Sequence, residues 1–163
     1  MPTWFFIICQ FSIIACAVVG GVFLTFSDFV MRSLNSANTA SGIEVMQVIN
    51  REVYRYVFMT LFLGLSAFSL FVIFYAGITL SGSTAVLVIM AGAIYLVGVF
   101  GVTVLFNVPM NNMLATLDYS TLEAVSYWKN TYLPDWTFWN SVRTMACVAS
   151  AVCYLVAGII HGL

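Results

Sequence analysis

The chain has 163 residues, of which 63% are hydrophobic and only 7% are charged, and its formal net charge is −1. Soluble domains carry roughly a quarter of charged residues, so this composition excludes an ordinary soluble protein. The absence of a basic surplus argues against nucleic acid as a partner. We therefore expect one domain over residues 1–163 in an integral, multi-pass membrane protein whose first partner is the lipid bilayer.

Four apolar runs are each long enough to cross a bilayer, which takes about 20 residues of helix. They extend from Trp4 to Phe26, from Tyr56 to Ile78, from Thr84 to Phe106 and from Phe138 to Ile160. Because lipid offers the backbone no hydrogen-bond partners, these runs must be helices. The predicted fold is an all-α membrane protein, an antiparallel bundle of four transmembrane helices with two long connections on one side.

The first connection contains two helix signals. Asp28 and Arg32 lie four residues apart and can pair on one helix side, so the first helix is expected to continue beyond the bilayer. The segment Ser41-Gly-Ile-Glu44 matches a capping box. It predicts that the second helix starts near Gly42 and runs unbroken into the membrane.

The second long connection carries two prolines and another capping box. Pro109 lies just past the third run and lacks an amide, which predicts that the helix kinks or ends there. The segment Ser120-Thr-Leu-Glu123 predicts a short helix at the membrane interface that reaches about Asn130. The dipeptide Pro134-Asp135 fits the first turn of the fourth helix.

Every formal charge lies on the side of the two long connections, residues 27–55 and 108–137, or close to it on the fourth helix. Cytoplasmic connections carry an excess of Lys and Arg. This pattern predicts that the charged side is cytoplasmic and that both termini are extracytoplasmic.

Polar side chains gather near this charged side, at the ends of otherwise apolar helices. Trp136, Asn140 and Arg143 share one helix face because they are spaced i, i+4 and i+7. Polar groups at membrane depth usually face a bundle interior or a wet cavity, so we expect a polar vestibule. The candidate catalytic residues are Asn107, Asn111, Asn140 and Arg143. The candidate substrate-binding residues are Asp28, Gln47, Asn50, Arg51, Trp136 and Trp139.

Structural interpretations compete with the vestibule. Arg143 can extend to the lipid headgroups, and Trp128 and Trp139 can belong to the aromatic belt of the interface. The buried amides can also form a polar plug that only sets the helix register.

Metal and cofactor sites receive little support from the sequence. His161 is the only histidine and lies at the opposite end from the vestibule, which excludes a three-histidine zinc site and a histidine-rich di-iron site. The four cysteines lie in apolar runs without a Cys-x-x-Cys motif, and we interpret them as small buried hydrophobic residues. No metal or other cofactor is predicted, although the sequence does not exclude haem or copper.

Two segments resemble those of a known family. Asn107-Val-Pro-Met-Asn-Asn112, followed by Trp136-Thr-Phe-Trp-Asn-Ser-Val-Arg143, is similar to the anthrone-oxygenase-like integral membrane family, most of whose members have no assigned function. Gly20-Gly21, the segment 26–31 and the segment 46–50 extend the resemblance over the whole chain. The resemblance implies a four-helix membrane protein. In fungal polyketide-pathway members it implies oxidation of an anthrone to an anthraquinone by dioxygen.

This chemistry would use the candidate residues as hydrogen-bond donors. An anthrone can be deprotonated to an electron-rich carbanion that itself reacts with dioxygen, so a metal is not required in principle. The protein would supply deprotonation, amide donors for the developing oxyanion and an apolar slot for a flat substrate. Asp28 is the only carboxylate near the predicted cluster.

Three functional hypotheses follow. The first is a membrane-embedded oxidoreductase that acts with dioxygen on a lipophilic aromatic or quinol-like substrate. The second is a non-catalytic membrane protein that binds or transports a small ligand or lipid through the polar vestibule. The third is a small structural subunit. The sequence leaves open whether the protein forms a homo-oligomer.

Overall fold

Long helices form nearly the whole chain in the computed structural model, which describes residues 1–55 and 57–162. Within that part, four helices are long and apolar enough to cross a membrane: Thr3–Ser36, Val57–Thr79, Gly82–Thr116 and Leu122–Gly162. The predicted all-α bundle with four spans is therefore confirmed. Tyr56, where the second apolar run was expected to begin, lies outside the described residues.

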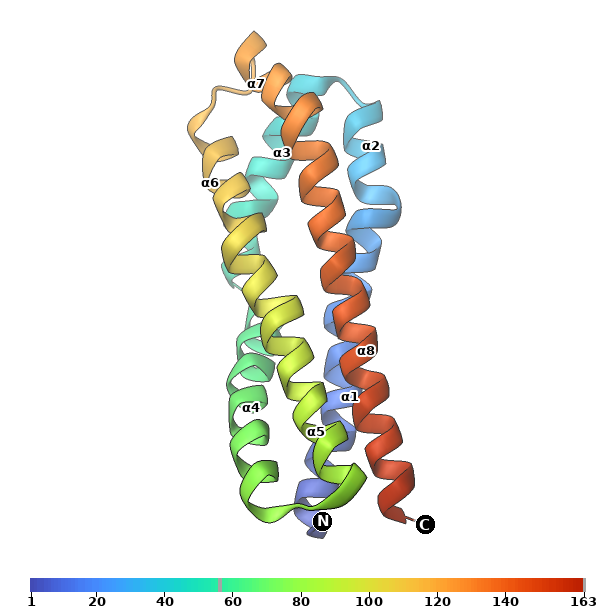
Figure 1. Ribbon diagram of the computed structural model, residues 1–163. Coiled ribbons are helices and arrows are strands. Elements are labelled where there is room, and N and C mark those ends of the chain that lie inside the picture. Colours follow the sequence, from blue (N-terminus) through green and yellow to red (C-terminus); the bar gives the residue numbers. More distant parts are fainter. Residues whose placement is uncertain (56, 163) are drawn as a thin grey trace.

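The four spans pack in an antiparallel arrangement. Helix α1 (Thr3–Thr25) lies along α8 (Thr137–Gly162), and α8 also packs on α5 (Gly82–Tyr95). Helix α4 (Val57–Thr79) packs on α5 and contacts α1 less extensively. Both termini and the α4–α5 turn lie at one end, and the two long connections lie together at the other, as the sequence predicted (Figure 1).

The first span does continue beyond the apolar run. Helix α1 passes through a π-helical turn, η1 (Phe26–Val30), into α2 (Met31–Ser36). The Arg32 guanidinium donates to Asp28 Oδ1 at 3.1 Å, so the predicted ion pair is confirmed.

The predicted start of the next helix is wrong. Helix α3 (Thr39–Glu52) begins before Gly42, because the Asn38 side chain accepts a hydrogen bond from the Ala40 amide and caps the helix there. The capping-box motif at residues 41–44 therefore lies inside the helix.

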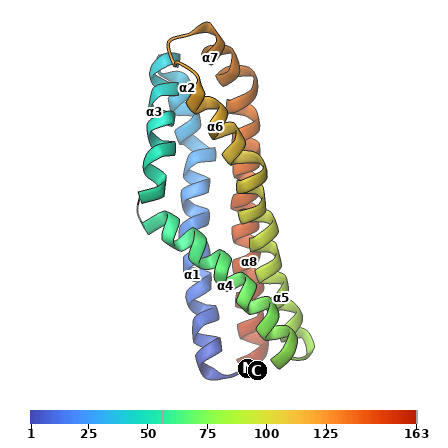
Figure 2. The same ribbon diagram turned by 90° about the vertical axis from the view of Figure 1, so that its left-hand side faces the viewer.

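The second helix is also not continuous, contrary to the prediction. Helix α3 ends at Glu52 and is followed by a 3₁₀ turn, η2 (Val53–Arg55), before α4 starts. The chain changes direction between α3 and α4 (Figure 2). The reason lies in packing: α3 covers the second connection, whereas α4 lies against α5, so the two helices do not share one axis.

The third span continues past Pro109. Helix α5 is followed by two π-helical segments, η3 (Leu96–Gly101) and η4 (Thr103–Asn107), and then by α6 (Val108–Thr116). Pro109 occupies the first turn of α6, where a missing amide is tolerated. Of the two predicted outcomes at Pro109, an end of the helix is therefore excluded.

The fourth span begins earlier than expected. Helix α7 (Leu122–Tyr127) is capped by Thr121, whose side chain accepts from the Ala124 amide at 3.2 Å, one residue later than the predicted cap. It continues through a long π-helical segment, η5 (Trp128–Trp136), directly into α8. Two predictions are thus wrong. No separate helix ends near residue 130, and Pro134 lies inside η5 rather than at a helix start.

The reason for this continuity is the burial of aromatic side chains. Trp128, Tyr132 and Trp136 are spaced four residues apart and are all buried, in a cluster with Met46 of α3 and Leu114 of α6. The end of the bundle at which the two long connections lie thereby gains a hydrophobic core of its own. This core holds η5 upright on the bundle instead of flat on the membrane.

Candidate functional site

A cavity of about 80 Å³ lies where the four spans meet α3. Part of its lining is apolar and rich in aromatic rings. The apolar lining includes Phe23, Phe26, Met46, Phe58, Met59, Phe62 and Trp136. The rest of the lining is polar and consists of amides, a hydroxyl and one guanidinium. The polar lining residues are Asn50, Thr103, Asn107, Asn111, Asn140 and Arg143.

Arg143 is the cation of this cavity and is only 5% exposed. Its Nη1 donates to Thr103 Oγ1 at 3.1 Å, its Nη2 donates to Asn140 Oδ1 at 2.7 Å, and its Nε has no hydrogen-bond partner within residues 1–55 and 57–162. The guanidinium carbon lies 4.2 Å from the ring centroid of Phe23, a cation–π distance. The side chain therefore stays inside the bundle, and the interpretation that it extends to the headgroups is wrong.

Arg143 also lacks an acidic partner among the described residues. The ion pairs recorded in residues 1–55 and 57–162 are Arg32 with Asp28 and Arg55 with Glu52, and both are largely exposed. A buried charge without a counter-ion is costly, by several kcal/mol. A cation left in this state is a functional candidate.

Asn140 holds the guanidinium in place. Its Nδ2 donates to the Phe23 carbonyl and to Ser27 Oγ, both at 2.6 Å, which leaves Oδ1 as the acceptor for Arg143. Ser141 Oγ also donates to Ser27 Oγ, at 3.0 Å. Ser27 lies in η1, and sequence reasoning missed it because a lone serine next to an apolar run carries no signal.

Asn107 and Asn111 face the cavity from the third span. Asn107 is 1% exposed, and its Nδ2 donates to the Trp136 carbonyl at 3.2 Å, while its Oδ1 has no partner in the part of the chain that the structure describes. Asn111 Oδ1 accepts two hydrogen bonds at 2.8 Å, from Tyr132 Oη and from Trp136 Nε1. Asn107, Asn140 and Arg143 all turn inward. Asn107 and Arg143 connect the third and fourth spans, whereas Asn140 bonds across to the first span.

An aromatic stack packs against the polar lining residues from the side of the long connections. The rings of Trp128 and Tyr132 are 5.3 Å apart and nearly parallel, and those of Tyr132 and Trp136 are 6.0 Å apart. The Trp136 ring centroid in turn lies 5.4 Å from the guanidinium carbon of Arg143. Asn50 joins the stack by donating to Tyr132 Oη at 3.2 Å.

Four residues predicted to bind substrate lie outside the cavity lining. Asp28 is exposed and paired with Arg32, and Arg51 is exposed on α3. Gln47 is buried, but its amide donates to the carbonyls of Leu114 and Leu117 and so ties α3 to α6. Trp139 stacks on Phe106 at 3.7 Å. Two predicted substrate-binding residues, Asn50 and Trp136, do line the cavity.

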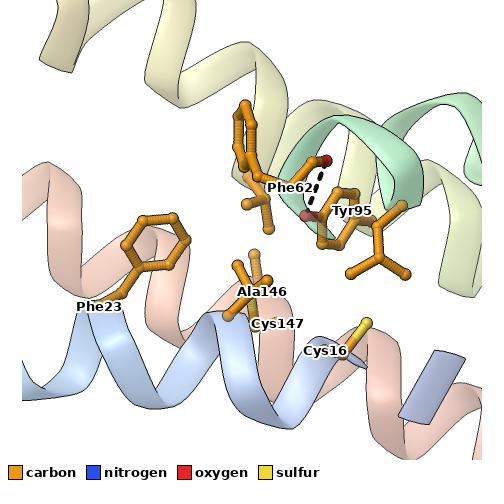
Figure 3. Packing of buried hydrophobic residues seen from close by; sticks show 9 residues of the cluster. Cys16, Phe23, Phe62, Tyr95, Ala146 and Cys147 are labelled. Atoms are coloured by element: carbon orange, nitrogen blue, oxygen red, sulfur yellow. Dashed lines mark hydrogen bonds between the residues drawn. The ribbon is translucent and has the colours of Figure 1, made fainter. Parts of the chain in front are cut away.

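A hydrophobic cluster of buried residues adjoins the cavity (Figure 3). Phe23 and Phe62 line the cavity and also belong to this cluster. Tyr95 Oη donates to the Phe62 carbonyl at 3.3 Å, which satisfies the buried hydroxyl. Cys16 and Cys147 are buried in the cluster as free thiols, in keeping with their interpretation as hydrophobic residues.

The cavity is surrounded by irregular helix. Segment η1 contributes Phe26 to the lining, η4 contributes Thr103 and Asn107, and η5 contributes Trp136. π-Helical turns are rare in proteins and occur often at functional sites, because they change the direction of side chains and free backbone groups. Three spans with such turns at one level support a functional interpretation of the cavity.

We place the mouth of the cavity at the break between α3 and α4, because its most exposed lining residue lies there. Tyr54 in η2 is the most exposed lining residue, with 58% of its surface accessible. Small-molecule sites typically enclose about 300–1,000 Å³, and this cavity is smaller. A flat aromatic ligand would therefore need the side chains at the mouth to turn outward.

A comparison with protein families assigns the chain to one of them. The model of the anthrone oxygenase family matches residues 50–153, a stretch that begins at Asn50 and includes Asn107, Asn111, Asn140 and Arg143. No curated protein and no solved structure matches the sequence. Because the family match covers more than half of the chain, and the cavity lies mostly within it, the chain belongs to the anthrone oxygenase family.

Proposed function

We propose that the protein is a membrane-embedded oxygenase that oxidises a lipophilic aromatic compound of the anthrone type with dioxygen. The observation that carries this proposal is the buried guanidinium of Arg143, which has no carboxylate partner among the described residues and faces an aromatic-lined cavity. Such a cation stabilises negative charge that develops on a substrate.

The proposed reaction begins with the loss of a proton from the CH₂ group of the anthrone, which forms an enolate. The enolate carbon bonds to dioxygen and forms a hydroperoxide. Loss of the second C–H proton and cleavage of the O–O bond then release water and form a carbonyl group. One oxygen atom ends in the quinone and the other in water, so that the CH₂ group loses four electrons and dioxygen gains them.

In this reaction the polar residues would stabilise charge, and the aromatic residues would position the substrate. Arg143 would stabilise the enolate, and Asn140 would hold its guanidinium through the 2.7 Å hydrogen bond. Phe23, Phe58 and Phe62 would hold the flat rings. Donors fixed before the reaction cost no reorganisation in the transition state, which is why they accelerate it.

We also propose that this chemistry proceeds without a metal or other cofactor, because an electron-rich carbanion reacts with dioxygen directly. An absorption spectrum and a metal analysis of the purified protein test this point. Haem, copper or another group present in a stoichiometric amount would overturn it.

The test of function is dioxygen uptake and quinone formation with anthrone, measured on the full-length protein in detergent or nanodiscs. Replacing Arg143 by Gln should lower the rate by about 10²–10³-fold while the variant keeps its helical content. The matched control is Arg51→Gln, since Arg51 is exposed and does not line the cavity, and it should keep the wild-type rate.

Two results would contradict the proposal. Wild-type protein that consumes no dioxygen with anthrone would refute an oxygenase of this type. If the protein still bound anthrone, the non-catalytic binding protein would become the better hypothesis. Equal losses of rate in the Arg51 and Arg143 variants would show that the cavity is not the reaction site.

A further inference from the structure

A groove follows the outer side of the seam between the first and fourth spans, which lie side by side along the bundle (Figure 1). It consists of two hollows. The first, of about 360 Å³, is lined by residues between positions 13 and 24 of α1 and between positions 144 and 155 of α8. The second, of about 370 Å³, is lined by residues between positions 27 and 35 of η1 and α2 and between positions 133 and 141 of η5 and α8.

The two hollows are parts of one groove, because the same faces of the same two spans line them. Lining residues follow one another at steps of three or four, the spacing that keeps to one helix face. On the first span they include positions 13, 16, 20, 24, 27, 31 and 35, and on the fourth span positions 155, 151, 148, 144, 141, 137 and 134. Leu24, Phe138 and Val148 in this lining are more than half exposed, so the groove opens towards the lipid.

The first hollow suits a hydrocarbon chain. Ile13 and Leu24 are eleven positions apart on α1, which corresponds to about 16 Å of helix. One leaflet contributes about half of the roughly 30 Å hydrocarbon thickness of a bilayer, so the hollow is as long as one leaflet's acyl layer. The Thr144 hydroxyl in its lining already donates to the Asn140 carbonyl at 3.1 Å, which leaves mainly alkyl and thiol groups to face an occupant.

The second hollow suits a lipid headgroup. It lies where the apolar runs of the first and fourth spans end, and its polar lining residues are Ser27, Arg32, Asn35, Thr137 and Ser141. The Arg32 guanidinium donates to Asp28 at 3.1 Å, and both side chains are largely exposed. A guanidinium has five N–H groups, so Arg32 can bind a phosphate without releasing Asp28.

The pairing of Arg32 with Asp28 decides which headgroup fits. A lone arginine at the interface attracts any anionic lipid, but the neighbouring carboxylate cancels this charge and repels a second anion. A phosphoethanolamine group carries both signs, with a phosphate for Arg32 and an ammonium that donates to Asp28. The choline headgroup also carries both signs, but its trimethylated nitrogen has no N–H to donate.

We propose that this groove binds one molecule of phosphatidylethanolamine, with an acyl chain in the first hollow, the phosphate on Arg32 and the ammonium on Asp28. The site lies outside the cavity and does not depend on the function proposed above. It adjoins the hydrogen bonds of the cavity, because Ser27 lines the second hollow and accepts from Asn140. A lipid held there also ties together the two spans that orient Arg143.

The headgroup is tested by native mass spectrometry of the delipidated full-length protein in detergent. The probes are dioleoyl phosphatidylethanolamine, phosphatidylcholine and phosphatidylglycerol at equal concentrations. The wild type should bind one phosphatidylethanolamine, favoured over phosphatidylcholine roughly 1.5- to 5-fold, the value of one exposed ion pair. Asp28→Asn should abolish this preference. Glu52→Gln is the matched control, since Glu52 forms an exposed ion pair with Arg55 outside the groove, and it should keep the preference.

The acyl chain is tested with a substitution that fills the first hollow. A Cβ at Gly21 would meet no atom of the described residues within 4 Å, so Gly21→Leu occupies the hollow without displacing its walls, and the bound lipid should be lost. Gly64→Leu is the matched control, because Gly64 is equally open but lies on α4 outside the groove, and it should bind lipid like the wild type. If Gly21→Leu does not fold, Val148→Trp fills the same hollow from the fourth span.

Three results would overturn the inference. The first is equal binding of the three lipids by the wild type, which is typical of lipid at an ordinary protein surface. The second is an undiminished phosphatidylethanolamine adduct in the folded variant with the filled hollow. The third is a wild-type dimer that Gly21→Leu dissociates, since a second copy of the chain would then occupy the groove. The ratio of two lipids within one variant cancels any general weakening of the fold.

Discussion

Asn140 Oδ1 accepts a hydrogen bond from Arg143 Nη2 at 2.7 Å, and both side chains are buried at one level of the bundle. The Asn140 amide is oriented from the other side by the Phe23 carbonyl, which is 117 residues away in the sequence. The direction of the guanidinium therefore depends on contacts between the first and fourth spans, and this dependence leads to the first prediction.

Replacing Asn140 by Leu should destabilise the bundle by about 1–3 kcal/mol and lower the melting temperature. Leu removes the donor to the Phe23 carbonyl and leaves Arg143 Nη2 buried without its acceptor. Thermal unfolding in detergent, followed by tryptophan fluorescence, measures the effect. Asn130→Leu is the control, since Asn130 is exposed and its side chain donates to Ser126, which is exposed as well. Equal melting temperatures for both variants would contradict the role given to Asn140.

Two neighbouring asparagines offer a matched pair. Asn111→Leu should destabilise the protein, because it leaves the Tyr132 hydroxyl and the Trp136 indole without their common acceptor, at about 1–3 kcal/mol for each donor. Asn112 is exposed, so Asn112→Leu should change stability by no more than about 0.5 kcal/mol. The test compares the melting curves of the two variants. If Asn112→Leu lost more stability than Asn111→Leu, Asn111 would not hold the aromatic stack in place.

The turn between α6 and α7 should respond to acid. The Ser120 amide and hydroxyl donate to Asp118 Oδ1 at 2.9 and 2.7 Å and hold the pKa of this carboxylate below its ordinary value. A lowered folded-state pKa stabilises the fold above the unfolded pKa of about 3.9, and the stabilisation is lost as pH falls through the folded value.

The melting temperatures of the wild type and Asp118→Ala should therefore differ slightly at pH 6 and converge towards pH 3. Asp135→Ala serves as the control, because Asp135 is also exposed. A difference for Asp118→Ala that is unchanged at pH 3 would mean that these hydrogen bonds do not depend on the charge.

The orientation in the membrane stays a prediction from the distribution of charge. With both termini extracytoplasmic, an impermeant thiol reagent added to intact cells should label Gly162→Cys but not Ser36→Cys. Both positions are exposed, and permeabilised cells should label both. Cys153, the one half-buried native cysteine, is first replaced by Ala. Labelling of position 36 alone would reverse the orientation.

Local properties of the sequence were enough to predict the architecture. About 20 consecutive apolar residues form a membrane helix whatever their neighbours are, because the backbone must satisfy its own hydrogen bonds in lipid. The common face of Asn140 and Arg143 follows from helix periodicity alone. The Asp28–Arg32 pair follows from the same periodicity and needs no contact with another span.

Long-range packing decided the remaining features of the site. Aliphatic side chains of α3 pack against aromatic side chains of η5. This packing accounts for the break after Glu52 and for the π-helical path through Pro134. Asn50 lines the cavity whereas Gln47, one turn earlier on the same helix, bonds to α6. The sequence determined which residues are polar at membrane depth. Only the tertiary structure decided which of them are paired, since a hydrogen-bond partner 117 residues away leaves no trace in the local pattern.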